Sequence, residues 1–98
     1  MKAVYLKEKL SDILFRIHTH KEHANIRLAS QAHNINIFKN DPDIPSQYQK
    51  QFERLIQDIE KAQLFYGNKE DIYKFPYMRK STAVKYIKLL IDIYWTLE

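Results

Sequence analysis

The helical repeat is clearest in residues 48–68, which read YQKQFERLIQDIEKAQLFYGN. Apolar side chains recur there every three or four residues, at Tyr48, Phe52, Leu55, Ile59, Ala62 and Tyr66. This spacing places them on one side of an α-helix. Gly67 and Asn68 follow the last apolar position, and these residue types end helices in the left-handed conformation. The stretch predicts an amphipathic helix over residues 46–66.

A second helical region is predicted on the N-terminal side, over residues 3–36. Its apolar positions are Leu6, Leu10, Ile13, Leu14, Ile17, Ala24, Leu28, Ala32 and Ile35. Their spacing fits either one long helix or two helices broken near 18–22, where the sequence is HTHKE. Residues 38–46, FKNDPDIPS, concentrate Asn, Asp and Pro, which end helices and begin turns. A turn is therefore expected between this region and the 46–66 helix.

A third long helix is predicted over residues 81–97, with a short helix near 69–74 before it. Ser81 or Thr82 can cap the long helix, and its apolar residues cover most of its circumference. Such a helix needs neighbours on several sides, so it is either the central helix of a bundle or part of a homodimer interface. The predicted core comprises Leu10, Ile13, Leu14, Ile17, Leu28, Phe52, Leu55, Ile59, Val84, Ile87, Leu90, Ile91 and Tyr94.

Composition favours one small all-α bundle over residues 1–98. A chain of 98 residues with 45% hydrophobic and 29% charged residues has the size and balance of a single globular domain. One Gly and three Pro are too few for the tight turns of a small β-sandwich or barrel. The chain has no cysteine, which fits a reducing compartment, and we expect a cytoplasmic protein. The apolar run over 86–97 is shorter than the roughly 20 residues that cross a bilayer, so no membrane association is expected.

The positive charge is concentrated near the C-terminus. Five cations lie between residues 74 and 88 with no acid among them, whereas the whole chain carries a net charge of +4. Phe75, Tyr77 and Tyr86 are interleaved with these cations. Cations beside flat aromatic rings are typical of surfaces that bind nucleic acids. The five cations are Lys74, Arg79, Lys80, Lys85 and Lys88.

Residues 70–91, EDIYKFPYMRKSTAVKYIKLLI, resemble the recognition half of a helix-turn-helix DNA-binding domain. In that family a short helix and a turn precede a recognition helix often written S-x-x-T-A-x-x-Y-I-x-x-L, which residues 81–90 match in part. The resemblance implies that Ile72, Val84, Ile87 and Leu90 or Ile91 pack inward. It also implies that DNA is contacted by Lys74, Arg79, Lys80, Thr82, Lys85 and Lys88.

Other kinds of site have weaker support in the sequence. His18, His20, His23 and His33 do not have the spacing of a zinc site, so no metal or other cofactor is expected. Arg27 and His33 have the separation seen in the helical HEPN ribonucleases, but this pair is about 240° apart around an ideal helix. We expect a protein that is not an enzyme. The alternative to nucleic-acid binding is a protein-binding inhibitor, immunity or phage-type adaptor protein that uses an apolar, Tyr-rich helix face.

Overall fold

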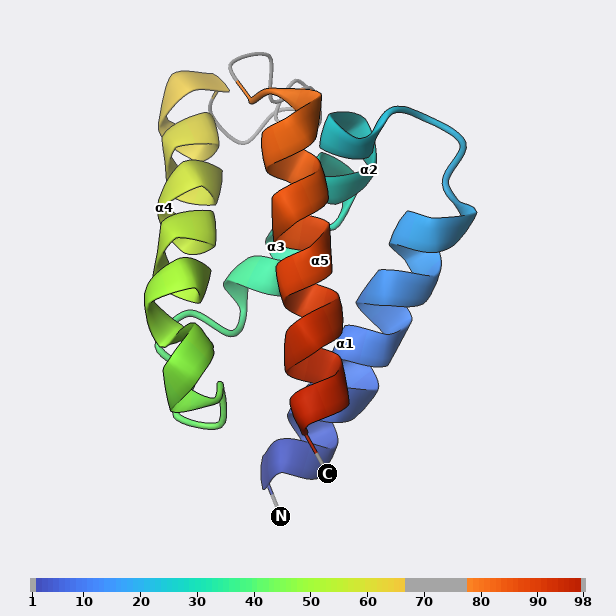
Figure 1. Ribbon diagram of the computed structural model, residues 1–98. Helices are drawn as coiled ribbons and strands as arrows, with labels where there is room; N and C mark the ends of the chain where they lie inside the picture. The colour runs from blue at the N-terminus through green and yellow to red at the C-terminus, as the bar shows by residue number, and fades with distance from the viewer. Residues whose placement is uncertain (1, 67–77, 98) are drawn as a thin grey trace.

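The N-terminal apolar pattern is divided among three helices. The computed structural model describes residues 2–66 and 78–97, beginning with α1 (Lys2–Thr19), α2 (Ala24–Ser30) and α3 (Ala32–Asn36) (Figure 1). The break that the sequence left open therefore lies over residues 20–23. His23 is extended there, with φ −63° and ψ 159°. A second break, which neither alternative predicted, lies at Gln31, whose φ of −107° and ψ of 7° separate α2 from α3.

The predicted turn and the helix after it are confirmed. Asn40 has a left-handed φ of 62°, and Asp41 Oδ1 accepts a hydrogen bond of 2.8 Å from the backbone N–H of Asp43. These local features reverse the chain before the 3-10 helix η1 (Ser46–Tyr48) and α4 (Gln49–Tyr66). The predicted short helix near 69–74, like the Gly67 and Asn68 cap, lies outside the described residues.

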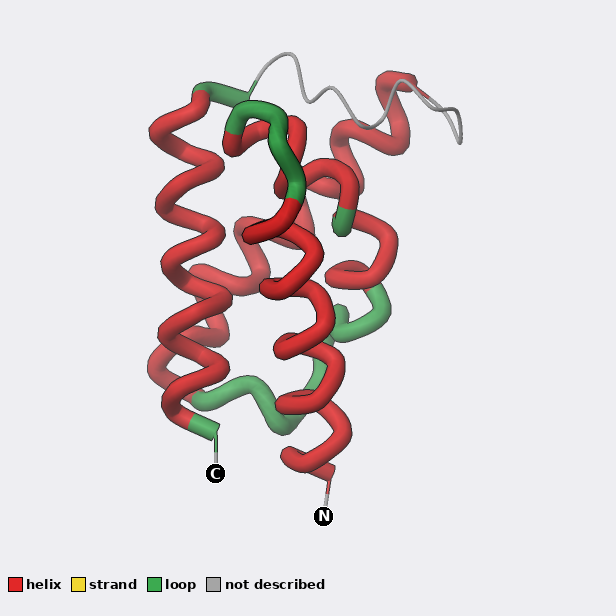
Figure 2. Tube along the Cα trace, turned by 90° about the vertical axis from the view of Figure 1, so that its right-hand side faces the viewer, coloured by secondary structure: helices red, strands yellow, loops and turns green. Residues whose placement is uncertain are grey.

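The last helix lies on one face of the bundle, between α1 and α4 (Figures 1 and 2). α5 (Lys80–Thr96) contacts α1, α2 and α4, and it runs antiparallel to α1, so that the two chain ends lie at the same end of the molecule (Figures 1 and 2). The described residues contain five α-helices and no strand, which confirms the all-α fold class. α5 thus packs against three helices on one side while its opposite side is exposed, so it is not covered on all sides as a central helix would be.

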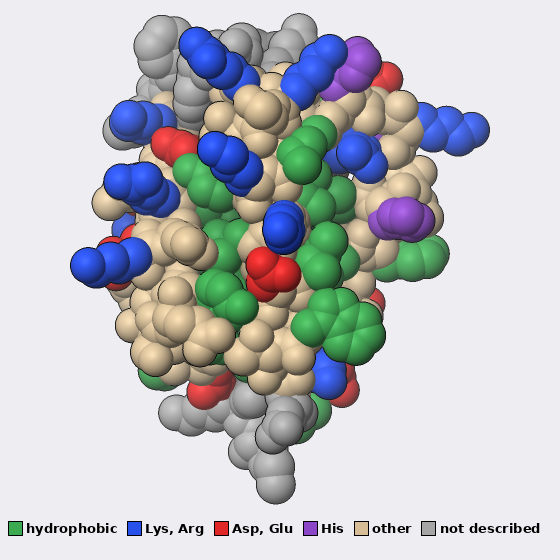
Figure 3. All heavy atoms as spheres, in the orientation of Figure 1, with side chains coloured by type: hydrophobic (Ala, Val, Ile, Leu, Met, Phe, Trp, Pro, Cys, Tyr) green, Lys and Arg blue, Asp and Glu red, His purple; other side chains and the backbone are tan. Residues whose placement is uncertain are grey.

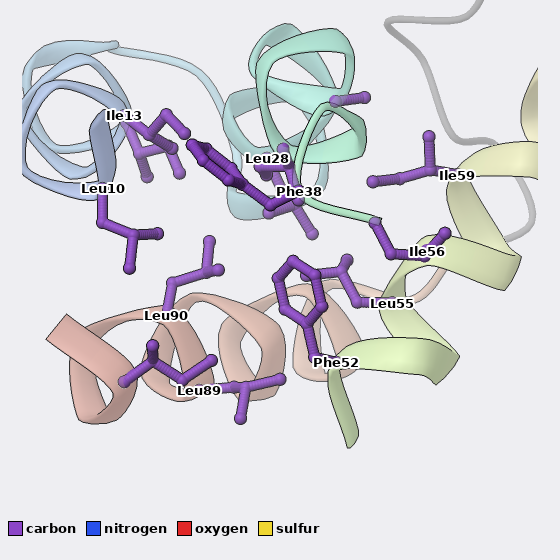
Figure 4. Close-up of a cluster of buried hydrophobic side chains, with 14 of the residues drawn as sticks. Leu10, Ile13, Leu28, Phe38, Phe52, Leu55, Ile56, Ile59, Leu89 and Leu90 are labelled. Carbon is purple, nitrogen blue, oxygen red and sulfur yellow. The ribbon is translucent and has the colours of Figure 1, made fainter. Parts of the chain in front are cut away.

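The hydrophobic core lies between α5 and the other helices. Leu28, Leu55 and Leu90 are fully buried and come from α2, α4 and α5 (Figure 4). Eight of the predicted core residues are buried, and Leu14, Ile87 and Tyr94 are partly buried against the same cluster. The eight are Leu10, Ile13, Ile17, Leu28, Phe52, Leu55, Ile59 and Leu90.

Two of the residues that were predicted to lie in the core are exposed, so the prediction is wrong for them. Val84 is 53% exposed and Ile91 is 38% exposed, because the side of α5 that faces the bundle is formed by other residues. That side carries Ala83, Leu90 and Ile93, each with no exposed surface. The inward packing of Val84 that the helix-turn-helix resemblance implied is therefore wrong as well.

Candidate nucleic-acid interface

Four of the predicted site residues are exposed to solvent. Arg79 immediately precedes α5, and Lys80, Lys85 and Lys88 lie in its first half, and all four side chains are exposed. Thr82 is only partly exposed, and Lys74 lies outside the described residues. The structure thus leaves four of the six predicted residues open to a ligand.

The lysines of α5 lie on the side of the helix that faces solvent. At about 100° per residue, Lys80, Lys88 and Lys85 fall within about 140° of the circumference. They are spread along about 12 Å of the helix axis. Thr82 lies about 60° beyond Lys85, toward α4, which agrees with its partial burial.

A hydrogen bond between two helices adds α4 to this surface. The Tyr86 hydroxyl donates to Asp58 Oδ2 over 2.5 Å, so the middle of α4 lies beside the first half of α5. Arg54 and Lys61 are four residues before and three residues after Asp58, and positions at these separations share one side of a helix. Both side chains are exposed. The two cations of α4 therefore lie about 40–60° around the helix from Asp58, on the exposed side beyond the seam with α5.

Most of the acidic side chains of α4 lie on a different side of the helix from Arg54 and Lys61. Glu53 and Glu60 each lie about 100° around the helix from the cation beside them in sequence, on the side away from Asp58. Glu60 is bound there to Lys39, with 2.6 Å between Nζ and Oε2. Asp58 itself accepts the Tyr86 hydrogen bond. Its negative charge is thus held at the seam between the helices, with cations on both sides.

These cations form one basic surface. Figure 3 shows Lys and Arg side chains over α4 and the upper half of α5, with few acidic side chains among them. We use the name basic surface for Arg54, Lys61, Arg79, Lys80, Lys85 and Lys88. The contribution of α4 was missed from the sequence. The signal for it is Lys50, Arg54 and Lys61, which recur on the polar side of the 46–66 helix.

The aromatic rings expected beside the cations are not all available to a ligand. Tyr86 is partly buried, and its hydroxyl is bonded to Asp58. Phe75 and Tyr77 lie outside the described residues. Val84, Ile91 and Trp95 instead occupy the exposed side of α5, at angles between those of Lys80 and Lys88. These apolar side chains cannot hydrogen-bond base edges, so the chemistry of this surface suits phosphates.

The other candidate sites are not assembled in the described residues. Arg27 lies in α2 and is partly buried, whereas His33 lies in α3 and is exposed, with the break at Gln31 between them. His18 and His23 are exposed as well. Across residues 2–66 and 78–97, no three His, Asp or Glu side chains come together in a way that would hold a metal ion.

No family model, curated protein or solved structure matches this chain. Within the described residues, no helix has the length and apolar character needed to cross a membrane. The helix-turn-helix resemblance stays a prediction, because residues 70–77, which would supply its first helix and turn, lie outside the described part of the chain.

Proposed function

We propose that this chain is a non-enzymatic, cytoplasmic module that binds nucleic acid through its basic surface. The observation that supports the proposal is the meeting of cations from two helices on one exposed face, while Asp58 between them accepts a hydrogen bond from Tyr86. Six cations grouped in this way attract a polyphosphate chain, and each contact with a phosphate releases a condensed counterion.

The contacts are made to the phosphate backbone, with little reading of base sequence. Lysine is a point charge on a flexible stem, and four of the six cations are lysines. The apolar side chains between them offer no donors or acceptors to base edges. If five or six phosphates are contacted, affinity for a DNA duplex should fall by roughly 10³-fold between about 50 and 200 mM salt.

The test is charge reversal on the basic surface, with a matched reversal elsewhere. Arg79→Glu with Lys85→Glu should abolish retention on immobilised duplex DNA at moderate salt. The control is Arg16→Glu with Lys9→Glu, which changes the same two residue types on exposed positions of α1. The control should keep most of the retention, and both proteins should keep their helical content, because exposed charges change stability by under about 0.5 kcal/mol. Equal retention by the wild type and the Arg79 and Lys85 double variant would count against the proposal.

Protein binding is the second candidate, and exposed apolar side chains favour it. Phe15 is 69% exposed, Ile37 is 64% exposed and Trp95 is 76% exposed. Large apolar side chains in the open are a common feature of protein interfaces. An inhibitor or adaptor acting through them would bind its partner in a way that tolerates salt, whereas binding to a nucleic acid weakens steeply as salt rises. Salt dependence therefore distinguishes the two functions.

A further inference from the structure

The side of α5 that faces away from the bundle carries its own heptad pattern. Its residues are separated by three, four, three and four positions, the spacing with which one helix packs along another. We use the name exposed stripe for these five residues, Ser81, Val84, Lys88, Ile91 and Trp95. All five side chains are exposed, including Val84 at 53%, Ile91 at 38% and Trp95 at 76%. It lies opposite a buried stripe of Ala83, Tyr86, Leu90, Ile93 and Leu97.

The aromatic end of the exposed stripe is held in place by its neighbours. The Trp95 and Tyr94 rings form a T-shaped pair, with centroids 5.4 Å apart and an angle of 81° between the planes. Lys7 Nζ of α1 lies 5.4 Å from the centroid of Tyr94. These contacts orient Trp95 while leaving most of it in solvent. A large ring held outward is the kind of side chain on which interfaces concentrate their binding energy.

We propose that a second copy of this chain covers the exposed stripe, in an antiparallel α5–α5 pair whose two-fold axis passes between Lys88 and Ile91. This inference does not depend on nucleic-acid binding, but Lys88 belongs to both the exposed stripe and the basic surface, so pairing removes Lys88 from the cations that phosphates can contact. In this arrangement Val84 of one copy packs against Trp95 of the other. Lys88 lies beside Ile91 of the second copy and next to its Asp92. The stripe is then self-complementary, as a two-fold interface requires.

Charge selects the antiparallel arrangement. Lys88 is a cation in an otherwise apolar or small row, and it needs an acid opposite it. Asp92, one turn further along α5, is brought there by the two-fold axis. The Arg79 and Lys80 ends of the two copies then lie about 30 Å apart along the pair. That separation is about four Debye lengths at physiological salt, so repulsion between them is largely screened. A parallel pair would instead place the same cations side by side.

The first test is the oligomeric state of the wild type and of three variants. Sedimentation velocity over protein concentrations up to about 1 mM should show a concentration-dependent dimer. The dimer is expected to be weak, because an interface formed by one side of a single helix from each copy is small. Ile91→Asp and Trp95→Asp should each weaken dimerisation by about tenfold or more, since each buries a charge among apolar side chains. Ile37→Asp, at a 64% exposed position outside the stripe, should dimerise like the wild type. A wild type that stays monomeric, or a dimer unchanged by both stripe variants, would overturn the proposal.

The second test fixes the direction of the pair by disulfide trapping, which is clean because the chain has no cysteine. A mixture of the Val84→Cys and Trp95→Cys proteins should form a mixed disulfide under mild oxidation. In the antiparallel pair the two Val84 positions are about 16 Å apart along the axis, beyond the roughly 7 Å that a disulfide spans. Val84→Cys alone should therefore remain largely unlinked. Efficient linking of Val84→Cys to itself would mean a parallel pair and would overturn the antiparallel arrangement.

The third test reverses the proposed ion pair. Lys88→Asp alone and Asp92→Lys alone each place like charges opposite one another and should weaken dimerisation by about tenfold or more. The double variant Lys88→Asp with Asp92→Lys restores opposite charges and should recover most of the lost affinity. Failure of the double variant to improve on either single variant would contradict the Lys88 to Asp92 contact.

Discussion

Leu90 and Ile91 are neighbours in the sequence and lie on different sides of α5: Leu90 is fully buried, whereas Ile91 is 38% exposed. Leu90 belongs to the buried stripe, which packs against the rest of the bundle. Ile91 belongs to the exposed stripe. The helix therefore has two rows of the same heptad spacing that carry large apolar side chains, of which the bundle covers one.

Substitutions in the two rows should have different effects on stability. We expect Leu90→Ala to lower the free energy of unfolding by about 2–5 kcal/mol, because it leaves a cavity in the core. Val84→Ala, at a 53% exposed position, should cost under about 1 kcal/mol. Urea unfolding at low protein concentration, where the chain is monomeric, measures both. Similar losses for the two variants would mean that α5 is rotated from the orientation described above.

The sequence predicted the helices better than it predicted the contacts of the last one. The positions of α4 and α5 followed from periodicity and from the Pro-rich turn before α4. The exposure of Val84 and Ile91 did not, because both rows of α5 are apolar and have the same spacing. Only the positions of α1, α2 and α4 decide which row is covered.

The sequence did not decide whether the N-terminal helix is broken after α1, and the reason is different. The apolar pattern continues across residues 20–23, and Ala24 and Leu28 are buried just as an unbroken helix would require. A chain that turns at this point and resumes as a helix keeps its apolar side inward in either case. Periodicity alone therefore cannot locate such a break.

The candidate site could be predicted only in part. The cations of α5 stood out because no acid lies among them in the sequence. Arg54 and Lys61 each follow a glutamate in the sequence, so the sequence around them shows no net positive charge. Their place on the basic surface depends on the register of α4 beside α5, which is seen in the hydrogen bond between Tyr86 and Asp58.

That hydrogen bond should contribute measurably to stability. We expect Tyr86→Phe to lower the free energy of unfolding by about 1–2 kcal/mol, because a partly buried hydrogen bond to a carboxylate is lost. Tyr5→Phe is a matched control, since Tyr5 is 55% exposed and its ring contact with Phe38 does not need the hydroxyl. The control should change stability by under about 0.5 kcal/mol. Equal effects in thermal or urea unfolding would contradict this role for Tyr86.

The left-handed conformation of Asn40 gives a test of the turn after α3. A β-carbon is unfavourable at the φ of 62° found there, and Asn tolerates it better than most residues. Asn40→Ala should therefore lower the free energy of unfolding by about 1 kcal/mol, whereas Asn40→Gly should have little effect. If Ala proves at least as stable as Gly at this position in urea unfolding, the turn has a different conformation.

Trp95 provides an internal reporter of the exposed stripe, because it is the sole tryptophan. At low protein concentration its emission should resemble that of tryptophan in water, and iodide should quench it readily, since 76% of the residue is exposed. As the concentration rises and the α5–α5 pair forms, emission should shift to shorter wavelength and quenching should decrease. An emission spectrum that does not change across the concentrations at which the dimer forms would exclude Trp95 from the interface.

The most direct test of the basic surface is to map amide chemical shifts while a short DNA duplex is added at low salt. We expect the largest shifts over residues 79–88 of α5 and 54–61 of α4, and we expect them to disappear as salt is raised. The α1 amides around Lys9 and Arg16 should change little, because those cations lie outside the basic surface. Shifts centred on α1, or no shifts at any duplex concentration at which the protein stays folded, would contradict nucleic-acid binding by this surface.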